Sequence, residues 1–408
     1  MPGLPAFCLR PRDVRRGAVL TLVFLAAVGA GAFTGSWDHP DPGRSAGPAA
    51  LVAGTEPSAT GVPPGPRAPA QAHRETGTAD RDAVARAAAE AVAEGKSAKS
   101  AAQEVVSRSG DRWGAVYDQG EYEAFADDLD GRWTGVGLWA GRLRDGRIEI
   151  DRVQPGSPAA RAGMRAGDRL LSIDGQGVTG LAVAEVVALL RGEAGTPVVL
   201  KLTRGGADLT ETVRREQLRS EPVTVRELPG GITVIKVASF TRGSGDRVRS
   251  AVRAAPPGGG VMLDLRGNTG GLVAEAVTAA SAFLDGGLVA TYDVRGAQRA
   301  LYATPGGDTA RPLVALIDGG TMSAAELVTG ALQDRGRAVA VGTRTFGKGS
   351  VQMPTELPDG SVAELTVGTY RTPAGRSLDG TGITPDLAAA DGVEERARTV
   401  LSGIGVGP

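Results

Sequence analysis

At 408 residues the chain is long enough to hold two or three domains, each with its own hydrophobic core. A formal net charge of −1 and an aromatic content of 4% offer neither the basic surface nor the stacking side chains typical of nucleic-acid binding. The histidines, His39 and His73, both lie in a segment rich in Pro, Gly and Ala. This placement argues against a serine–histidine–aspartate triad and, with Cys8 as the single cysteine, against a zinc hydrolase site.

The N-terminus carries the pattern of an export signal within residues 1–35. An apolar, uncharged run at 17–33 follows four arginines, Arg10, Arg12, Arg15 and Arg16. This pattern predicts either a signal peptide, with 30–32 as a small-residue cleavage site, or an uncleaved anchor. A run of about 17 residues is near the lower limit for crossing a bilayer. We slightly favour the anchor, and in either case expect the folded part of the chain to be exported, membrane-tethered or secreted.

Residues 36–79 are rich in Pro, Gly, Ala and Thr without apolar periodicity, which predicts a disordered linker. The composition changes at Asp80, where alanines alternate with charged residues and predict one or two helices broken near Gly95. The segment from 112 to 131 is interpreted as a further helical stretch. We therefore expect an N-terminal helical region at 80–131, and its simplest interpretation is a structural cap.

A second unit is predicted at 132–208, with short strands at 148–153, 169–173 and 198–203 and a helix near 181–190. Its run GSPAARAGMRAGDRLLSIDG closely resembles a PDZ domain of the protease-associated type. A PDZ domain binds a peptide as an added strand, and N–H groups of a glycine-containing loop hold the terminal carboxylate. The resemblance implies a carboxylate loop of Gly135, Val136, Gly137 and Leu138. The helix face with Val183, Val186, Val187 and Leu190 would line the apolar pocket. These side chains could instead belong only to the core, and for Val187 and Leu190 the two interpretations are equally supported.

The third unit, at 217–390, alternates apolar strands with helices. Continuous apolar runs at 232–240, 261–267 and 313–318 are typical of buried parallel strands. Helical patterns lie between them, which favours α/β architecture with crossover connections. A further strand is predicted around Leu365, Val367 and Tyr370, and residues 391–408 are expected to form a C-terminal tail that begins with a short helix.

The stretch from 319 to 352 carries the candidate chemistry. Ser323 precedes an amphipathic helix, where the helix dipole favours developing negative charge. It also fits a capping box with Glu326, an interpretation that needs no catalysis. Without a histidine nearby, a catalytic serine needs another base, and a desolvated lysine can serve as one. Lys348 lies between two glycines in a chain with only five lysines. Gln352, four residues on, is expected on the same side as Lys348.

At these residues the chain resembles the C-terminal processing (tail-specific) serine peptidases. The resemblance rests on 323–326 (SAAE), 329–332 (TGAL) and 347–352 (GKGSVQ), and it extends over roughly 110–390. It implies a nucleophile Ser323, a general base Lys348 and an orienting Gln352. The motif at 264–271 (DLRGNTGG) implies an oxyanion donor from Gly270 or Gly271, with the N–H of Ala324 as the second. Asp264 and Arg266 are expected to form a structural pair.

The resemblance completes the expected architecture. We expect a mixed α/β (α+β) peptidase core, preceded by a PDZ domain and an N-terminal helical cap. The expected activity is that of an exported serine endopeptidase that binds the C-terminal ends of proteins and needs no cofactor or metal. Assembly into a homo-oligomer or with an activator protein is compatible with the family.

The sequence also has features of two other functions. The spacing of Gly342, Gly347 and Lys348 approaches a phosphate-binding loop, but Gly349 replaces the required Ser or Thr, and the prolines that follow prevent the helix such a loop opens. The alternative from a different class is a membrane-tethered PDZ adaptor on a peptidase scaffold without turnover. All three catalytic residue types are present, so the sequence favours the enzyme.

Overall fold

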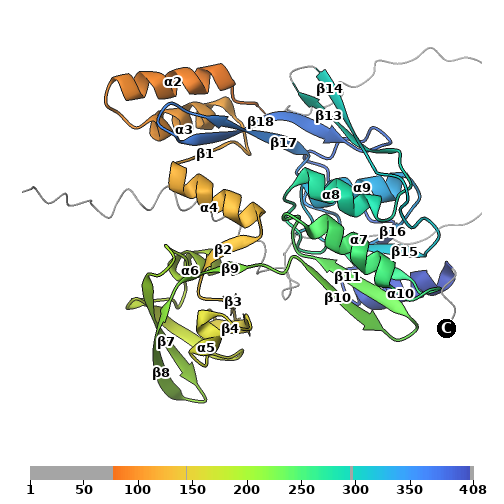
Figure 1. The fold of residues 1–408 in the computed structure, drawn as a ribbon, viewed down its shortest axis with the longest axis horizontal. Helices are drawn as coiled ribbons and strands as arrows, with labels where there is room; N and C mark the ends of the chain where they lie inside the picture. The colour runs from red at the N-terminus through yellow and green to blue at the C-terminus, as the bar shows by residue number, and fades with distance from the viewer. Residues whose placement is uncertain (1–76, 144, 295–296, 405–408) are drawn as a thin grey trace, which may run out of the picture.

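The structure, a computed structural model, describes residues 77–143, 145–294 and 297–404 (Figure 1). The predicted export segment at 1–35 and the predicted linker up to residue 76 lie outside these ranges. Among the described residues, no helix combines the length and apolar character needed to cross a bilayer. The described chain is organised as an N-terminal helical unit, a PDZ unit and a larger α/β unit (Figure 1).

A six-stranded sheet forms the centre of the α/β unit, in the strand order β10-β11-β12-β15-β16-β19. Neighbouring strands are parallel, except that β10 joins one edge antiparallel. The inner strands are short apolar runs buried on both faces, as parallel sheets require. The six strands are β10 (Val223–Leu228), β11 (Ile232–Val237), β12 (Val261–Asp264), β15 (Leu313–Ile317), β16 (Val339–Gly342) and β19 (Leu387–Ala388).

Helices cover both faces of this sheet (Figure 1). Alternate residues of a strand point to opposite faces, so Ile235 and Leu263 pack on one side and Val234 and Met262 on the other. The first face is covered by α7 (Ser244–Ala254), α8 (Val273–Ser281) and α9 (Ala324–Asp334), and the second by α10 (Val393–Gly403). The predicted α/β architecture is therefore confirmed.

A second sheet joins the α/β unit to the N-terminal helices (Figure 1). Its strand order is β1-β18-β13-β14, and β17 pairs with β18. Helices α2 and α3 pack on this sheet through a small apolar cluster that includes Val106 and Leu365. The elements are α2 (Arg81–Ala93), α3 (Ala98–Ser109), β1 (Ala115–Tyr117), β13 (Leu288–Val294), β14 (Ala297–Tyr302), β17 (Ser350–Glu356) and β18 (Val362–Arg371).

The prediction of a helical stretch throughout 112–131 was wrong for its first part. Strand β1 occupies Ala115–Tyr117, and the helix, α4, spans Gln119–Leu129. Strand β1 pairs antiparallel with β18, with Val116 opposite Ala363. A three-residue strand depends on its distant partner, so local periodicity does not reveal it.

The PDZ unit is a sheet in the order β3-β4-β5-β7-β8, with β6 paired to β5. Strand β3 lies at its edge, and β8 extends the sheet past residue 208. A two-stranded ribbon of β2 and β9 runs along the PDZ unit. The elements are β2 (Arg132–Gly135), β3 (Leu138–Arg142), β4 (Ile148–Val153), α5 (Pro158–Arg161), β5 (Arg169–Ile173), β6 (Gln176–Gly177), α6 (Val183–Leu190), β7 (Pro197–Arg204), β8 (Ala207–Arg214) and β9 (Glu216–Arg219).

Candidate active site

Ser323 lies beyond the carboxyl end of strand β15, immediately before helix α9. This edge of a parallel sheet is where α/β proteins place ligands and reacting groups. Ser323 has φ 54° and ψ −118°, one of two positive-φ positions occupied by a residue other than glycine among the described residues. Such a backbone costs about 1–3 kcal/mol and occurs mostly at functional sites. The serine is partly exposed, while Ala324 and Ala325 behind it are buried.

A buried carboxylate connects the serine with the lysine segment. Glu326 accepts hydrogen bonds from the backbone N–H groups of Ser323 (2.9 Å) and Lys348 (2.9 Å). It also accepts from the N–H of Gly347 (2.8 Å) and the hydroxyl of Thr345 (2.5 Å). Burial raises the pKa of Glu326, and these four hydrogen bonds oppose that rise. The Ser323 hydroxyl makes no capping hydrogen bond to the helix, so the carboxylate half of the capping box leaves the hydroxyl available for chemistry.

Lys348 is buried, with 3% of the residue exposed. Burial lowers the pKa of its ammonium to about 8, because desolvation disfavours the charged form. Three carboxylates, those of Glu364, Asp111 and Asp379, oppose this shift. A substantial fraction of the amine is therefore neutral near pH 8, as a general base requires.

Gln352 lies in strand β17, opposite Thr366 of β18. Its amide nitrogen donates to the hydroxyls of Ser350 (2.8 Å) and Thr366 (3.3 Å). The Thr366 hydroxyl in turn donates to Asp111 Oδ1 at 2.8 Å. Gln352 is thus anchored within a polar network between strands, and its predicted role in orienting Lys348 stays a prediction.

The glycine loop after β12 lies against the serine. A Cβ placed on Gly270 would approach Ser323 Cβ at 3.0 Å and the backbone nitrogen of Ala324 at 3.1 Å. The N–H of Gly270 donates to Asn268 Oδ1 at 2.8 Å. Gly271 forms a parallel bridge with Phe240, whose geometry turns the N–H of Gly271 away from Phe240. Among the described residues, neither Gly271 nor Ala324 has a partner for its N–H.

The glycines of this loop are required by the backbone. Gly270 and Gly271 have φ of +101° and +126°, conformations that side chains rarely adopt. A Cβ on Gly271 would lie 2.5 Å from the carbonyl oxygen of Phe240. As expected, Asp264 and Arg266 nearby form a structural pair, in which the guanidinium donates two hydrogen bonds to the carboxylate (2.9 and 2.7 Å).

The predicted peptide site of the PDZ unit is divided between core and surface. Val136 and Leu138 belong to the PDZ core, as do Val186 and Leu190 of helix α6. Gly137 has φ +85°, and a Cβ there would lie 2.2 Å from Ser157 Cβ. Val183 and Val187 on α6 are partly exposed, and Gly135 ends strand β2. Strand β3 is an edge strand, so the sheet can accept an added peptide strand.

Sequence reasoning missed a group of side chains that surround Lys348 from distant segments. The Trp113 ring centroid lies 4.8 Å from Lys348 Nζ, and Asp111 of the same loop acts electrostatically on the amine. Glu364 lies on β18, where burial raises its pKa to about 7 while the charge of Lys348 opposes the rise. Thr366 connects Asp111 with Gln352. No local pattern marks these residues, because their roles depend on the pairing of β1 with β18.

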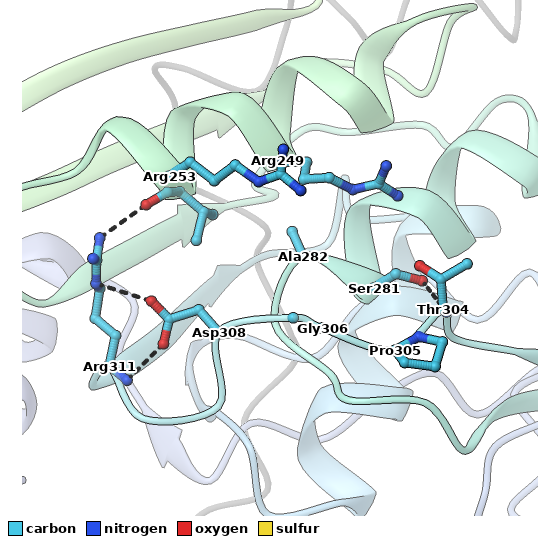
Figure 2. Close-up of a pocket in the computed structure, with 11 residues that line it drawn as sticks. Arg249, Arg253, Ser281, Ala282, Thr304, Pro305, Gly306, Asp308 and Arg311 are labelled. Carbon is cyan, nitrogen blue, oxygen red and sulfur yellow. Dashed lines mark hydrogen bonds and ion pairs between the residues drawn. The ribbon is translucent and has the colours of Figure 1, made fainter.

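A cavity of about 250 Å³ lies away from these groups, at the C-terminal ends of α7 and α8 (Figure 2). Figure 2 shows Arg249 and Arg253 extending from α7, with Arg311 paired to Asp308. Arg311 also donates to the carbonyl of Val252 near the end of α7. Cations at helix C-termini stabilise the helix dipole, which gives these arginines a structural role.

The α/β unit and the PDZ unit each match a known protein family. The profile of the family described as "Peptidase family S41" matches residues 231–389, and that of "PDZ domain" matches 149–204. The "Carboxy-terminal processing protease CtpA" of Bacillus subtilis (strain 168) is 32% identical over 284 residues, which cover 68% of this chain and 61% of the relative. The "Carboxy-terminal-processing protease" of Bartonella bacilliformis is 34% identical over 281 residues, which cover 66% of this chain and 64% of the relative. The chain thus spans less than two thirds of these relatives' length.

Among solved structures, the "Photosystem II D1 C-terminal processing protease" resembles the chain with a TM-score of 0.50. The two are 30% identical, and the match covers 74% of this chain and 85% of that one. At 74% of the chain, the match is longer than the α/β unit alone.

Proposed function

Because the chain belongs to peptidase family S41, we propose that it is an exported serine endopeptidase that recognises the C-terminal ends of proteins. The observation that carries the proposal is the connection between Ser323 and Lys348. Both segments donate backbone N–H groups to the buried carboxylate of Glu326. One segment offers a strained, partly exposed serine and the other a buried amine with a lowered pKa.

In the proposed reaction, the neutral amine of Lys348 takes the proton of the Ser323 hydroxyl while Oγ attacks the scissile carbonyl carbon. The resulting ammonium then gives its proton to the leaving amine, and an acyl-enzyme remains. Water, deprotonated by Lys348, hydrolyses the ester and restores the serine. No oxidant, reductant or cofactor enters this balance.

The oxyanion of the tetrahedral intermediate needs preorganised donors. We assign them to the N–H groups of Gly271 and Ala324, since the N–H of Gly270 is engaged by Asn268. Each such donor contributes about 3 kcal/mol to the transition state. Gly270 then serves by its lack of a side chain, which allows the loop to lie against Ser323.

Substrate capture is assigned to the PDZ unit. A peptide adding to the free edge of β3 would lay its C-terminal side chain between β3 and α6, near Val183 and Val187. The N–H groups of 135–138 would hold the carboxylate. Partly exposed valines favour small or apolar C-terminal residues.

The compartment is proposed from the N-terminal sequence alone. Arginines before the apolar run at 17–33 support export, with either a retained membrane anchor or cleavage near 30–32. The enzyme would then act outside the cytoplasm on protein substrates.

The test compares the full chain in detergent with its Ser323→Ala variant on an unfolded reporter that ends in apolar residues. The same reporter with an amidated C-terminus measures carboxylate capture. We expect the variant to lose at least about a thousandfold in kcat/KM, and amidation to weaken cleavage by the wild type. Equal cleavage by both proteins would refute Ser323 as nucleophile. Binding of the free-carboxylate reporter without cleavage by either would favour the PDZ adaptor instead.

A further inference from the structure

The N-terminal helical unit places an aromatic ring on the buried lysine. The Trp113 ring centroid lies 4.8 Å from Lys348 Nζ, within the range of about 6 Å for a cation–π interaction. The same ring meets Phe346 edge to face, with centroids 5.9 Å apart. Trp113 Nε1 is buried and finds no hydrogen-bond acceptor among the described residues. The orientation of the ring therefore follows from its contacts with Lys348 and Phe346 and not from a hydrogen bond of the indole.

The loop that carries Trp113 is fixed to the sheet of the active site. Asp111 accepts the N–H of Trp113 (3.1 Å) and of Gly114 (2.8 Å), and so closes the loop on itself. The same carboxylate accepts the N–H (2.9 Å) and the hydroxyl (2.8 Å) of Thr366 on β18. Since Asp111 is buried, these hydrogen bonds are shielded from water and hold the ring in a defined place.

The charged groups that act on Lys348 come from three segments. Glu364 lies on β18, Asp111 lies in the loop before β1, and Asp379 lies in the loop after β18. All three are acidic and favour the ammonium form. The Arg112 guanidinium carbon lies 5.0 Å from the Trp113 ring centroid. Burial, and to a lesser extent the charge of Glu364, raises the pKa of both Tyr117 and Tyr122.

A buried base faces two opposed requirements. It must be neutral before the reaction, a form that burial favours, and it must hold a full positive charge once it has taken the serine proton. Water, which would stabilise that charge, is largely excluded around Lys348. The negative face of an indole stabilises an ammonium without adding a titratable group, and it also fixes the direction in which the amine lies.

We propose that Trp113 is a positioning residue for Lys348, so that the N-terminal helical unit supplies the surface against which the ammonium forms during proton transfer. The inference rests on the proposed function, in which Lys348 is the base. It gives the helical unit a part in the reaction, in addition to its expected role as a cap. The carboxylate of Glu364, on strand β18, also favours the ammonium form of Lys348.

The experiment measures the titration of Lys348 directly. The full chain carrying Ser323→Ala is labelled with ¹³C-lysine, and its five lysines are followed by NMR from about pH 6 to 10.5. Lys348→Arg identifies the Lys348 signal by its loss. The variants are Trp113→Leu, which removes the aromatic face, Trp113→Phe, which keeps a weaker one, and Glu364→Gln. Trp139→Leu is the matched control, because Trp139 lies 3.7 Å from the guanidinium carbon of Arg152 in the PDZ unit.

We expect Trp113→Leu to lower the midpoint of the Lys348 titration by about one pH unit, because the ammonium loses the aromatic face beside it. Trp113→Phe should lower it by less, and Trp139→Leu should leave it unchanged. The Phe variant preserves the packing if the Leu variant does not fold. An unchanged midpoint in both Trp113 variants would overturn the proposal, and so would an equal shift in Trp139→Leu.

Kinetics separate this inference from the proposed function. In the chain with Ser323 intact, Trp113→Leu is expected to lower kcat more than tenfold at saturating reporter, to leave KM within about twofold, and to move the acid limb of kcat/KM to lower pH. A rise in KM without a fall in kcat would contradict the role of Trp113 in positioning Lys348. Retained activity of Ser323→Ala would refute the nucleophile, yet the NMR titration would still report whether Trp113 holds the Lys348 ammonium.

Discussion

At the scale of the residue, the site is organised by one carboxylate that does not itself react. Glu326 joins the backbone of Ser323 to that of Lys348, and so fixes both segments without using either side chain. It occupies the third position of α9, where a glutamate also complements the helix dipole. Glu326 thus binds the backbone of both residues without engaging the serine hydroxyl or the lysine amine, and its hydrogen bond holds the strained backbone of Ser323.

The proposed role of Lys348 predicts how the reaction depends on pH. The pKa of Lys348 is lowered to about 8, so the neutral amine that the proposed mechanism requires predominates above that pH and the ammonium below it. We expect kcat/KM to rise with pH up to about 8 and then to level off, measured with the C-terminal reporter under conditions where the protein stays folded.

Glu364→Gln provides the control for this profile. Removing the carboxylate removes a group that favours the ammonium, so the rise should move to lower pH. A profile that is flat from about pH 6 to 9 in the wild type would count against Lys348 as the base.

At the scale of the element, the antiparallel pair β17–β18 brings together residues that the chain keeps far apart. Strand β17 carries Gln352 and follows Lys348 directly, while β18 carries Glu364 and Thr366. The other edge of β18 pairs with β1, which brings the preceding loop with Asp111 to the site. A strand in the middle of this sheet thus collects contributions to the site from both ends of the protein.

Thr366→Val tests this connection. The valine keeps the shape of the side chain but removes the hydroxyl that bridges Gln352 and Asp111. We expect the free energy of unfolding to fall by about 1–3 kcal/mol, since a buried carboxylate loses a donor, and kcat to fall with it. Denaturant unfolding and reporter cleavage measure the two effects.

Thr233→Val is the matched control for this substitution. Thr233 is also buried, and its hydroxyl donates to the carboxylate of Glu227. Thr233 lies at the amino end of β11, whereas Ser323 follows the carboxyl end of the parallel strand β15. The Thr233→Val variant should have a lower free energy of unfolding than the wild type but the same kcat. If both valine variants lose kcat to the same extent, the network around Thr366 has no specific part in the reaction.

The site residues that we propose from the sequence are those whose signal is local. A lysine between glycines in an arginine-rich chain, and a serine before an amphipathic helix, indicate Lys348 and Ser323 as candidates without knowledge of the fold. The strand and helix pattern of the α/β unit was equally readable, because buried parallel strands are continuous apolar runs. Trp113 and Glu364 were not identified, since their contacts with Lys348 depend on a pairing between segments some 250 residues apart.

At the scale of the whole molecule, capture and cleavage are assigned to separate units. After the last PDZ strand, β8, the chain enters β9, which pairs with β2 in a separate two-stranded ribbon (Figure 1). The ion pair of Arg191 with Asp128 connects the end of α6 to α4. Each unit has its own apolar core. A change confined to the peptide site should therefore affect capture without removing the chemistry at Ser323.

Gly137→Ala tests the separation. The alanine would combine a positive φ with a Cβ only 2.2 Å from Ser157 Cβ, so the loop must move. We expect binding of a labelled peptide with an apolar C-terminus to weaken at least tenfold in the Ser323→Ala background, measured by fluorescence anisotropy.

Gly205→Ala is the matched control, because that glycine also has a positive φ, of +57°, but has open space around it. In the Ser323→Ala background, Gly205→Ala should leave the affinity for the peptide unchanged. Wild-type affinity of Gly137→Ala would remove the loop at 135–138 from the proposed carboxylate site.

The pairing of β1 with β18 also determines when, during synthesis, the surroundings of Lys348 can form. Synthesis proceeds from the N-terminus, so α2 and α3 leave the ribosome early and can form from local contacts. The strand that receives them, Val362–Arg371, is among the last to emerge. A nascent chain therefore cannot assemble the surroundings of Lys348 until it is almost complete. The order of the sequence therefore delays assembly of the proposed site until late in synthesis.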